Sequence, residues 1–392
     1  MLPTGFRPAV ADVSAVRAVP ESAMSAPLDI REIEWERPPL VEPKPDAEFE
    51  RWARQTGTPR IYPLRFFTRC PWLARGMARL STMEFAYLEH ELADLAVLVV
   101  SQDNSCRYCY AGARFLLRVT GMSEAGIESL EGDLVAAEVE PRNRLGLEFV
   151  RQLSRSNPPP SAEDVEALRA AGFSREELLE LAFVTAQYAA NNRITTFVAL
   201  QPESFERLDR GWVVQLLGPI LRHRVKTRRN RRSTAVLSAE EKDGPFAAEV
   251  VALDGLPGGR KLRQILDDAW SSPILSRRAK ALTFAVVARG LGAERVEGEA
   301  LDLLAAEGFD RNAAEEVLAH LASPALDAVE SALVPFVRET LWYQPAPLQR
   351  RARQLLDELN EAELLETIGL AAFANAVCRL SVAIDAIEAS PA

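Results

Sequence analysis

The sequence predicts an all-helical protein made of two similar halves. Its 392 residues are 48% hydrophobic and 26% charged, and the residues that dominate its periodic segments (Ala, Leu, Glu and Arg) are strong helix formers. Apolar side chains recur at helical spacing, and no segment alternates in the manner of a strand. Blocks of the first half also return in the second half. These three observations favour packed helices over any fold that contains a sheet.

Residues 1–47 lack this periodicity and contain the proline-rich stretch ERPPLVEPKPD. We expect them to form an extended or partly disordered N-terminal arm. Helical patterning begins after them, and in residues 83–102 Leu88, Leu92, Leu95 and Val99 fall on one face. The pattern predicts further helices over residues 105–120, 123–131, 141–154, 161–170 and 174–192.

Local signals fix several ends of these helices. Gly121 follows one helix as a C-cap, and Ser161 precedes another as an N-cap. Ser174 and Glu177 have the spacing of a capping box at the start of a long apolar helix.

The second half repeats the first at an almost constant offset. FVRQLS begins at Phe149 and FVRETL at Phe336, and two aligned segments that end at Gly121 and Gly308 have the same separation. Residues 176–193 align with 362–379 at an offset that is shorter by a single position. Three blocks in one order predict two tandem copies of one helical domain. We expect these domains over residues 48–221 and 246–392, joined by a basic linker over 222–245.

The linker contains RHRVKTRRNRR, residues 222–232, with seven Lys and Arg. This run is either an anion-binding patch or a solvated connection between domains. The formal net charge of −10 favours the second interpretation and argues against a nucleic-acid partner.

The sequence also bears on the compartment of the protein. No apolar run approaches the roughly 20 residues that span a bilayer, and we see no secretory signal at the N-terminus. Four cysteines in so long a chain do not form a disulfide scaffold. We therefore expect a cytoplasmic protein with no membrane partner.

The segment SCRYCYAGA, residues 105–113, holds two of the four cysteines at C-x-x-C spacing. Cys106 and Cys109 open a predicted helix, where the helix dipole stabilises a thiolate. The spacing also allows a disulfide, so the pair has the features of a redox centre. The repeat places Ala293 and Val296 at the same positions, which indicates that the scaffold does not need the sulfurs.

Two other interpretations of the cysteine pair are a zinc site and a pair of small core residues. A structural zinc site needs about four ligands, and the remaining Cys and His residues are isolated in the sequence: Cys70, His90, His223, His320 and Cys378. We therefore expect neither a metal nor a cofactor.

The stretch DLAVLVVSQDNSCRYCYAGARFLLRVTG, residues 94–121, resembles the AhpD-like/carboxymuconolactone decarboxylase family. The downstream stretch 166–193, which ends in an Asn-Arg pair, is similar to the closing helices of that family. The resemblance covers about residues 80–210 and, in degenerate form, about residues 270–388. It implies an all-α fold that assembles as a homo-oligomer, such as a trimer.

The resemblance further implies a peroxidase that reduces hydroperoxides and is regenerated by a thiol or dithiol electron donor. Carried over to this sequence, the resemblance implies that Cys109 is the attacking thiol and Cys106 the resolving thiol. Asp94, twelve residues before Cys106, would be the carboxylate of a proton relay, although the family typically has the longer Glu there.

One position departs from the family pattern. The histidine that follows the second cysteine by four residues is Ala113 here, and the repeat has Ala300. His90 lies one turn before Asp94 on the same predicted helix, so a His–Asp pair is a substitute relay that we consider. Two alternatives to a peroxidase stay open: a thiol–disulfide exchange protein or redox sensor, and a non-enzymatic assembly module.

Overall fold

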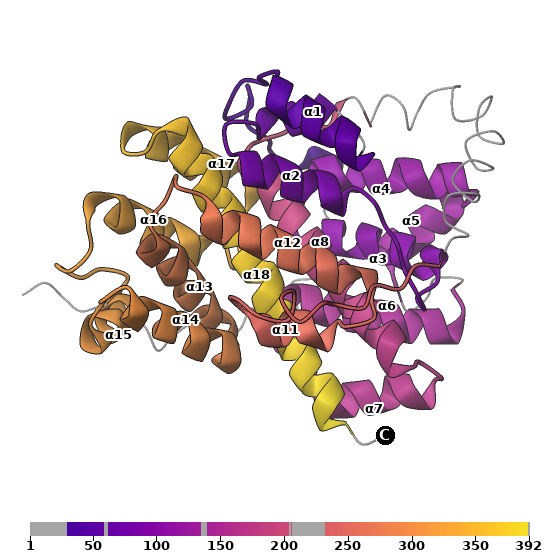
Figure 1. Cartoon of the computed structure of the whole chain (residues 1–392). Helices are drawn as coiled ribbons and strands as arrows, with labels where there is room; N and C mark the ends of the chain where they lie inside the picture. Colours follow the sequence, from indigo (N-terminus) through magenta and orange to yellow (C-terminus); the bar gives the residue numbers. More distant parts are fainter. Residues whose placement is uncertain (1–29, 59–61, 135–138, 204, 206–231, 391–392) are drawn as a thin grey trace, which may run out of the picture.

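Two long helices, α8 (Arg175–Phe197) and α18 (Glu361–Ala389), pack against each other at the centre of the protein (Figure 1). The computed structural model describes residues 30–58, 62–134, 139–203, 205 and 232–390. Within these ranges the secondary structure is helical, apart from one isolated bridge between Ala235 and Gly255. The all-α prediction is confirmed for this part of the chain.

The remaining helices fall into two groups along the chain. The first group comprises α1 (Ala47–Thr56), α2 (Pro71–Leu80), α3 (His90–Asp103), α4 (Arg107–Thr120), α5 (Glu124–Gly132), α6 (Pro141–Arg155) and α7 (Ala162–Ala170). The second comprises α11 (Ala247–Ala252), α12 (Pro257–Ser271), α13 (Arg277–Leu291), α14 (Glu294–Ala306), α15 (Arg311–His320), α16 (Ala328–Glu339) and α17 (Pro345–Gln354). Three short 3₁₀ turns cover Ile30–Glu32, Tyr62–Phe66 and Leu355–Asp357.

The two groups follow the same order at nearly the same offset. A single offset relates the starts of α3 and α13, α4 and α14, α5 and α15, and α6 and α16, and the offset between α8 and α18 is shorter by only one position. In the first group α3 packs against α4, α6 and α8, while in the second α13 packs against α14, α16 and α18. Corresponding helices therefore make corresponding contacts.

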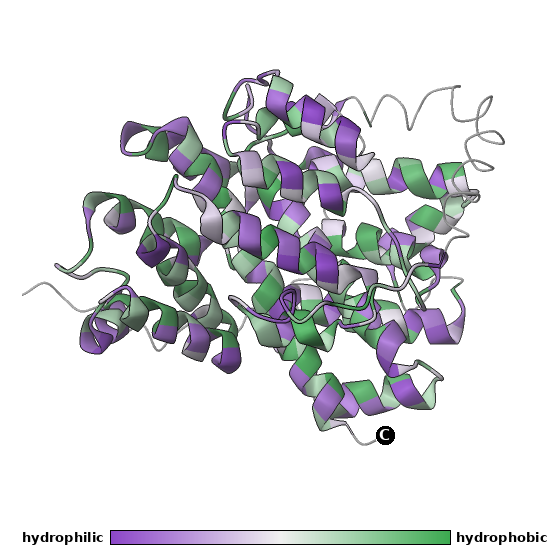
Figure 2. Ribbon diagram, in the orientation of Figure 1, coloured by the Kyte–Doolittle hydropathy of each residue, from purple (hydrophilic) through white to green (hydrophobic). Residues whose placement is uncertain are grey.

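Helix α18 differs from the sequence expectation that no segment is apolar enough to span a bilayer. By length and composition alone, α18 is long and apolar enough to cross a membrane. Its most apolar window has a mean hydropathy of 1.6, and its ribbon is largely green in Figure 2. However, 94% of that window is buried inside the protein. A helix that is apolar on all sides suits the core of a large helical protein, which is where α18 lies.

The predicted N-terminal arm is packed where it is described. Residues 30–46 contain one 3₁₀ turn and otherwise no regular structure, yet Trp35 and Leu40 are buried. The Trp35 indole donates to Leu200 O at 3.1 Å, and the Leu40 amide donates to Val198 O at 2.9 Å. Glu36 joins the second half through a bond from its amide to Gln349 Oε1 at 2.9 Å. Residues 1–29, and residues 222–231 of the predicted basic linker, lie outside the described residues.

Most predicted helix ends agree with the structure. Helices α4 to α7 begin and end within two residues of the predicted ranges, and Gly121 ends α4 with a left-handed φ of 112°. Ser174 and Glu177 form the predicted capping box of α8, which continues five residues beyond the predicted end.

Helix α3 is the exception, because it begins at His90 rather than near residue 83. The buried carboxylate of Glu180, on α8, accepts the backbone N–H groups of Ala86, Tyr87 and Leu88 at 2.6, 2.8 and 2.7 Å. These bonds hold the preceding segment in a loop, since its amides already have a partner outside the helix.

We predict that Glu180→Ala lowers the free energy of unfolding by about 2–4 kcal/mol, because it leaves several amides of this loop without an acceptor. Urea unfolding followed by circular dichroism measures the change. Glu166→Ala, at an exposed position of α7, is the matched control and should change the stability by less than about 0.5 kcal/mol. Equal stability of the two variants would contradict this role of Glu180.

Candidate thiol site

The cysteine pair lies at the turn between α3 and α4. Ser105 has a left-handed φ of 51° and reverses the chain, and the Cys106 amide donates to Ser101 O at 3.0 Å. Cys106 is the N-cap residue of α4, where its Sγ accepts the backbone N–H of Cys109 at 3.4 Å. Both cysteines are free thiols in this structure. The first turn of the helix therefore directs an N–H donor and the positive end of its dipole at a sulfur.

Thr195, near the end of α8, joins the two sulfurs. Its Oγ1 lies 3.2 Å from Cys106 Sγ and 3.3 Å from Cys109 Sγ. The same hydroxyl is 2.8 Å from Asn191 O, to which it donates. A hydroxyl has one proton and two lone pairs. It can thus accept from a thiol while it donates to the carbonyl, or turn its proton toward a thiolate.

The two thiols differ in acidity. Burial alone would raise the pKa of Cys106, but hydrogen bonds with Cys109 and Thr195 outweigh it and lower that pKa to about 7. The hydrogen bond to Cys106 and burial hold the pKa of Cys109 well above its usual value. The pair loses its first proton near neutral pH. The negative charge that results opposes loss of the second proton, so above that pH the two sulfurs share one proton.

Exposure ranks the two thiols in the opposite order. Cys106 is completely buried, whereas Cys109 is partly exposed. The more acidic sulfur is therefore the one that solvent does not reach. A reagent from solution meets Cys109 first, while the charge is stabilised at Cys106.

Side chains at the end of α8 fix the position of the thiol turn. Asn192 donates from Nδ2 to Val100 O at 3.0 Å, and Ser101 Oγ lies 3.4 Å from Asn192 Oδ1. On the outer side of α4, the ring of Phe205 meets Tyr108 edge to face at 5.2 Å. The site is built from α4 and α8, with the last turn of α3 as its support.

The other predicted site residues lie on α3, outside the thiol turn itself. His90 begins α3, and eleven residues, or about 16 Å of helix, separate it from Ser101 at the thiol turn. Its ring packs against Phe85 at 5.1 Å, and its part in a proton relay stays a prediction. Asp94 is buried one turn further along α3, and its role stays a prediction. Ala113, in the position of the family histidine, is buried on α4.

The second half has no thiol at the equivalent helix start. Ala293 is the N-cap residue of α14 and makes no side-chain cap bond, although its φ of −86° matches the −87° of Cys106. Nearby, Arg295 donates to Glu249 Oε1 at 3.0 Å and to Ser381 Oγ at 3.3 Å. Ser381 occupies the position in α18 that corresponds to Thr195 in α8. An ion pair therefore lies beside the counterpart of the bridging hydroxyl.

The remaining cysteines are chemically different. Burial raises the pKa values of Cys70 and Cys378, and both side chains are inaccessible to solvent. Among the described residues, no group of three or more His, Cys, Asp or Glu side chains could hold a metal ion.

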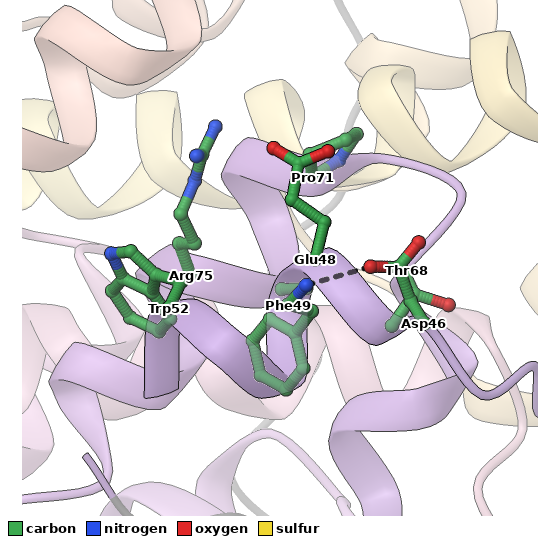
Figure 3. Close-up of a pocket in the computed structure, with 8 residues that line it drawn as sticks. Asp46, Glu48, Phe49, Trp52, Thr68, Pro71 and Arg75 are labelled. Atoms are coloured by element: carbon green, nitrogen blue, oxygen red, sulfur yellow. Dashed lines mark hydrogen bonds between the residues drawn. The ribbon is translucent and has the colours of Figure 1, made fainter. Parts of the chain in front are cut away.

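A small hollow lies between α1 and α2, and Figure 3 shows its lining. Its volume of about 30 Å³ has room for little more than a water molecule. Asp46, which faces it, caps α1 by accepting the Phe49 amide at 2.6 Å. We assign this hollow a structural role only.

Comparisons with known proteins leave the family of this chain open. No family model matches the sequence, and no curated protein matches it. Among solved structures, the chain is similar to an uncharacterized peroxidase-related protein from Silicibacter sp. TM1040, with 23% identity and a TM-score of 0.36. That match covers 47% of this chain and 99% of the other. A likeness this weak decides neither fold nor activity, so the chemistry of the thiols has to follow from their geometry.

The sequence prediction identified the two thiols but not Thr195. Its position is 86 residues after Cys109, and nothing in the local pattern links the two. The available signal was the pair of threonines in ITTF, residues 194–197, which follow Asn191, Asn192 and Arg193 near the end of the helix.

We predict that Thr195→Val raises the pH midpoint of Cys106 ionisation from about 7 by about one pH unit, the effect of losing one hydrogen bond to a charged group. The ultraviolet absorbance of the thiolate, followed against pH, measures it. Cys70 and Cys378 do not interfere, because their pKa values are raised.

Thr195→Ser keeps the hydroxyl and serves as the matched control for this measurement. Its midpoint should stay near that of the wild type. A midpoint in Thr195→Val that also equals the wild type would show that the hydroxyl does not stabilise the thiolate.

Proposed function

We propose that this protein is a thiol-dependent hydroperoxide reductase with Cys106 and Cys109 as its redox pair. The observation that carries the proposal is the shared hydroxyl: Thr195 Oγ1 lies within 3.3 Å of both sulfurs, at a helix start where the first ionisation falls near pH 7. A thiolate is the reactive form toward peroxides, and a second thiol beside it can resolve the product.

Cys109 is the attacking sulfur in this proposal, because it is the partly exposed one. The proton of its hydrogen bond to Cys106 moves to Cys106, and the Cys109 thiolate attacks the outer oxygen of ROOH. The O–O bond breaks, Cys109 becomes a sulfenic acid, and the alkoxide takes up a proton from solvent to leave as ROH.

Cys106 then attacks the sulfenic sulfur and displaces hydroxide, which leaves as water with the Cys106 proton. The result is an internal disulfide, and the peroxide has been reduced by two electrons. An external thiol or dithiol donor returns both electrons and protons to the pair.

The second half has a structural role in this proposal. The matching order and offsets of the helices support two tandem copies of one domain, over residues 48–221 and 246–392 with a linker between them. Only the first copy keeps the thiols, since Ala293 and Val296 occupy the equivalent positions. One chain then corresponds to a dimer of single domains, and three chains would form the trimer that we expect from the resemblance.

Thiol–disulfide exchange is the second candidate function. Ala113 favours it, because no imidazole is present at this position to protonate the leaving alkoxide. Exchange needs only an accessible thiolate and a resolving thiol, both of which the pair offers.

We predict that hydrogen peroxide or cumene hydroperoxide converts the pair to an internal disulfide much faster than it oxidises a free thiol at neutral pH. Stopped-flow kinetics with mass spectrometry of the product measures the reaction. Cys109→Ser should lose the fast phase. Cys106→Ser lacks the thiolate that takes the Cys109 proton, so it should react more slowly and stop at a sulfenic acid on Cys109 that dimedone traps.

Cys378→Ala removes a buried thiol and should react like the wild type. Rates no better than a free thiol would rule out the peroxidase. In that outcome, rapid reaction with a small aromatic disulfide would establish exchange, and slow reaction would leave the pair without a redox role.

A further inference from the structure

The segment between α16 and α17, in the second half of the chain, is bound to the end of α8. Arg193, on α8, donates from Nε to Thr340 O and from Nη2 to Leu341 O, both at 2.9 Å. Gln349, on α17, donates from Nε2 to Thr196 O at 2.8 Å. These bonds lie just before and just after the residue whose hydroxyl joins the two sulfurs. The second half therefore fixes that turn of α8.

Tyr343, in the same segment, packs its ring on α8. The ring meets Phe197 edge to face at 4.9 Å, and the Arg193 guanidinium lies 5.5 Å from its centroid. Arg193 and Phe197 are four residues apart, so they share one face of the helix. The phenol is therefore held beside the turn of α8 that contains Thr195 and Thr196.

Two hydroxyls at this contact have no hydrogen-bond partner among the described residues. They are Tyr343 Oη and Thr196 Oγ1, and both atoms are buried. The neighbouring hydroxyl of Thr195, by contrast, is engaged by a carbonyl and by both sulfurs. Buried polar groups without a partner are rare in proteins, and each calls for a physical explanation.

The thiol pair lies within electrostatic reach of these hydroxyls. Burial raises the pKa of Tyr343, and negative charge on Cys106 or Cys109 adds to that effect. The Thr196 hydroxyl is one of the groups that lower the pKa of Cys106. It lowers the pKa of Tyr343 as well, so it is close to both. Because its pKa is raised, the phenol keeps its proton while Cys106 ionises and can serve as a donor.

The other charged and titratable groups near the pair have different partners. Burial and the charge of the thiols raise the pKa of Tyr108, on α4, so this phenol stays neutral too. Arg107, which follows Cys106, donates to Ile33 O at 3.3 Å. Arg193 holds the two carbonyls described above. Both guanidinium groups thus bind backbone carbonyls, whereas the two hydroxyls are uncommitted.

The first half of the chain has no such phenol at the equivalent place. Arg379, on α18, donates from Nε to Ser154 O at 3.1 Å, which corresponds by the repeat offset to the bond from α8 to Leu341 O. Two positions further along, the first half has Ser156 where the second half has Tyr343. The phenol therefore faces the helix that carries the thiol partner, and its counterpart beside α18 is a serine.

We propose that Tyr343 is a positioning residue of the thiol site, supplied by the second half of the chain. When Cys106 loses its proton, the Thr196 hydroxyl turns its O–H toward the sulfur and accepts the O–H of Tyr343. Both hydroxyls then have partners, and the thiolate gains a donor that the phenol polarises. This role rests on the proposed function, since it concerns the acidity of the same redox pair.

The ultraviolet absorbance of the thiolate, followed against pH, tests this role in Tyr343→Phe, which keeps the ring and removes only the hydroxyl. We expect the midpoint of Cys106 ionisation to rise from about 7 by at least about half a pH unit. Tyr62→Phe, at an exposed position, is the matched control and should titrate like the wild type. A midpoint in Tyr343→Phe equal to that of the wild type would overturn the proposal.

Urea unfolding at about pH 5, where Cys106 holds its proton, separates this role from a structural one. The hydroxyl has no partner to lose in the thiol form, so Tyr343→Phe should unfold at the same urea concentration as the wild type. A lower urea midpoint would show that the hydroxyl supports the fold itself, and it would also overturn the proposal.

Thr196→Val tests the connection between the phenol and the sulfur. We expect each single variant to raise the pH midpoint, and the double variant with Tyr343→Phe to raise it no further than Thr196→Val alone. Additive shifts would show that the phenol does not act through Thr196. Thr196→Ser keeps the hydroxyl and should titrate like the wild type. These titrations use no peroxide, so their outcome is independent of the kinetics that test the proposed function.

Discussion

The packing of α8 against α18 is the contact on which the rest of the structure depends. Both helices are buried on nearly every side, so each must satisfy its polar side chains inside the protein. Asn192, Arg193 and Thr195 lie within one turn of α8, and all three make hydrogen bonds to other elements or to the thiols. The central helix pair therefore buries the core and also places the polar groups that define the thiol site.

The sequence was informative wherever a structural cause is local. Capping residues, C-terminal glycines and apolar spacing act over a few residues, which is why the ends of α4 to α7 agree with the prediction. It was uninformative where the cause is distant. Helix α3 begins later than predicted because Glu180, more than ninety residues away, accepts the N–H groups of the loop before it. The hydrogen-bond partner of both thiols is Thr195 on α8. The motif identified the two thiols as site residues. Contacts between residues this far apart in the sequence can be seen only in the folded structure.

Cys106 combines a structural and a chemical task at one position. As an N-cap it offers a sulfur to the Cys109 amide, which is a weak cap compared with Ser or Asp. The equivalent residue of the second half, Ala293, makes no cap bond at all with almost the same φ. The helix thus does not need the sulfur for its stability, and the amide is available to stabilise a thiolate. The same hydrogen bonds that compensate for burial are those that set the acidity of the pair.

Tyr343 adjoins a buried arginine of α8, because the Arg193 guanidinium lies 5.5 Å from the centroid of its ring. Burial raises its pKa, the positive charge of Arg193 opposes that effect, and negative charge on Cys106 or Cys109 adds to it. One phenol thus lies within electrostatic reach of the thiols and of a buried guanidinium. Charges inside a protein interact strongly, because water does not screen them.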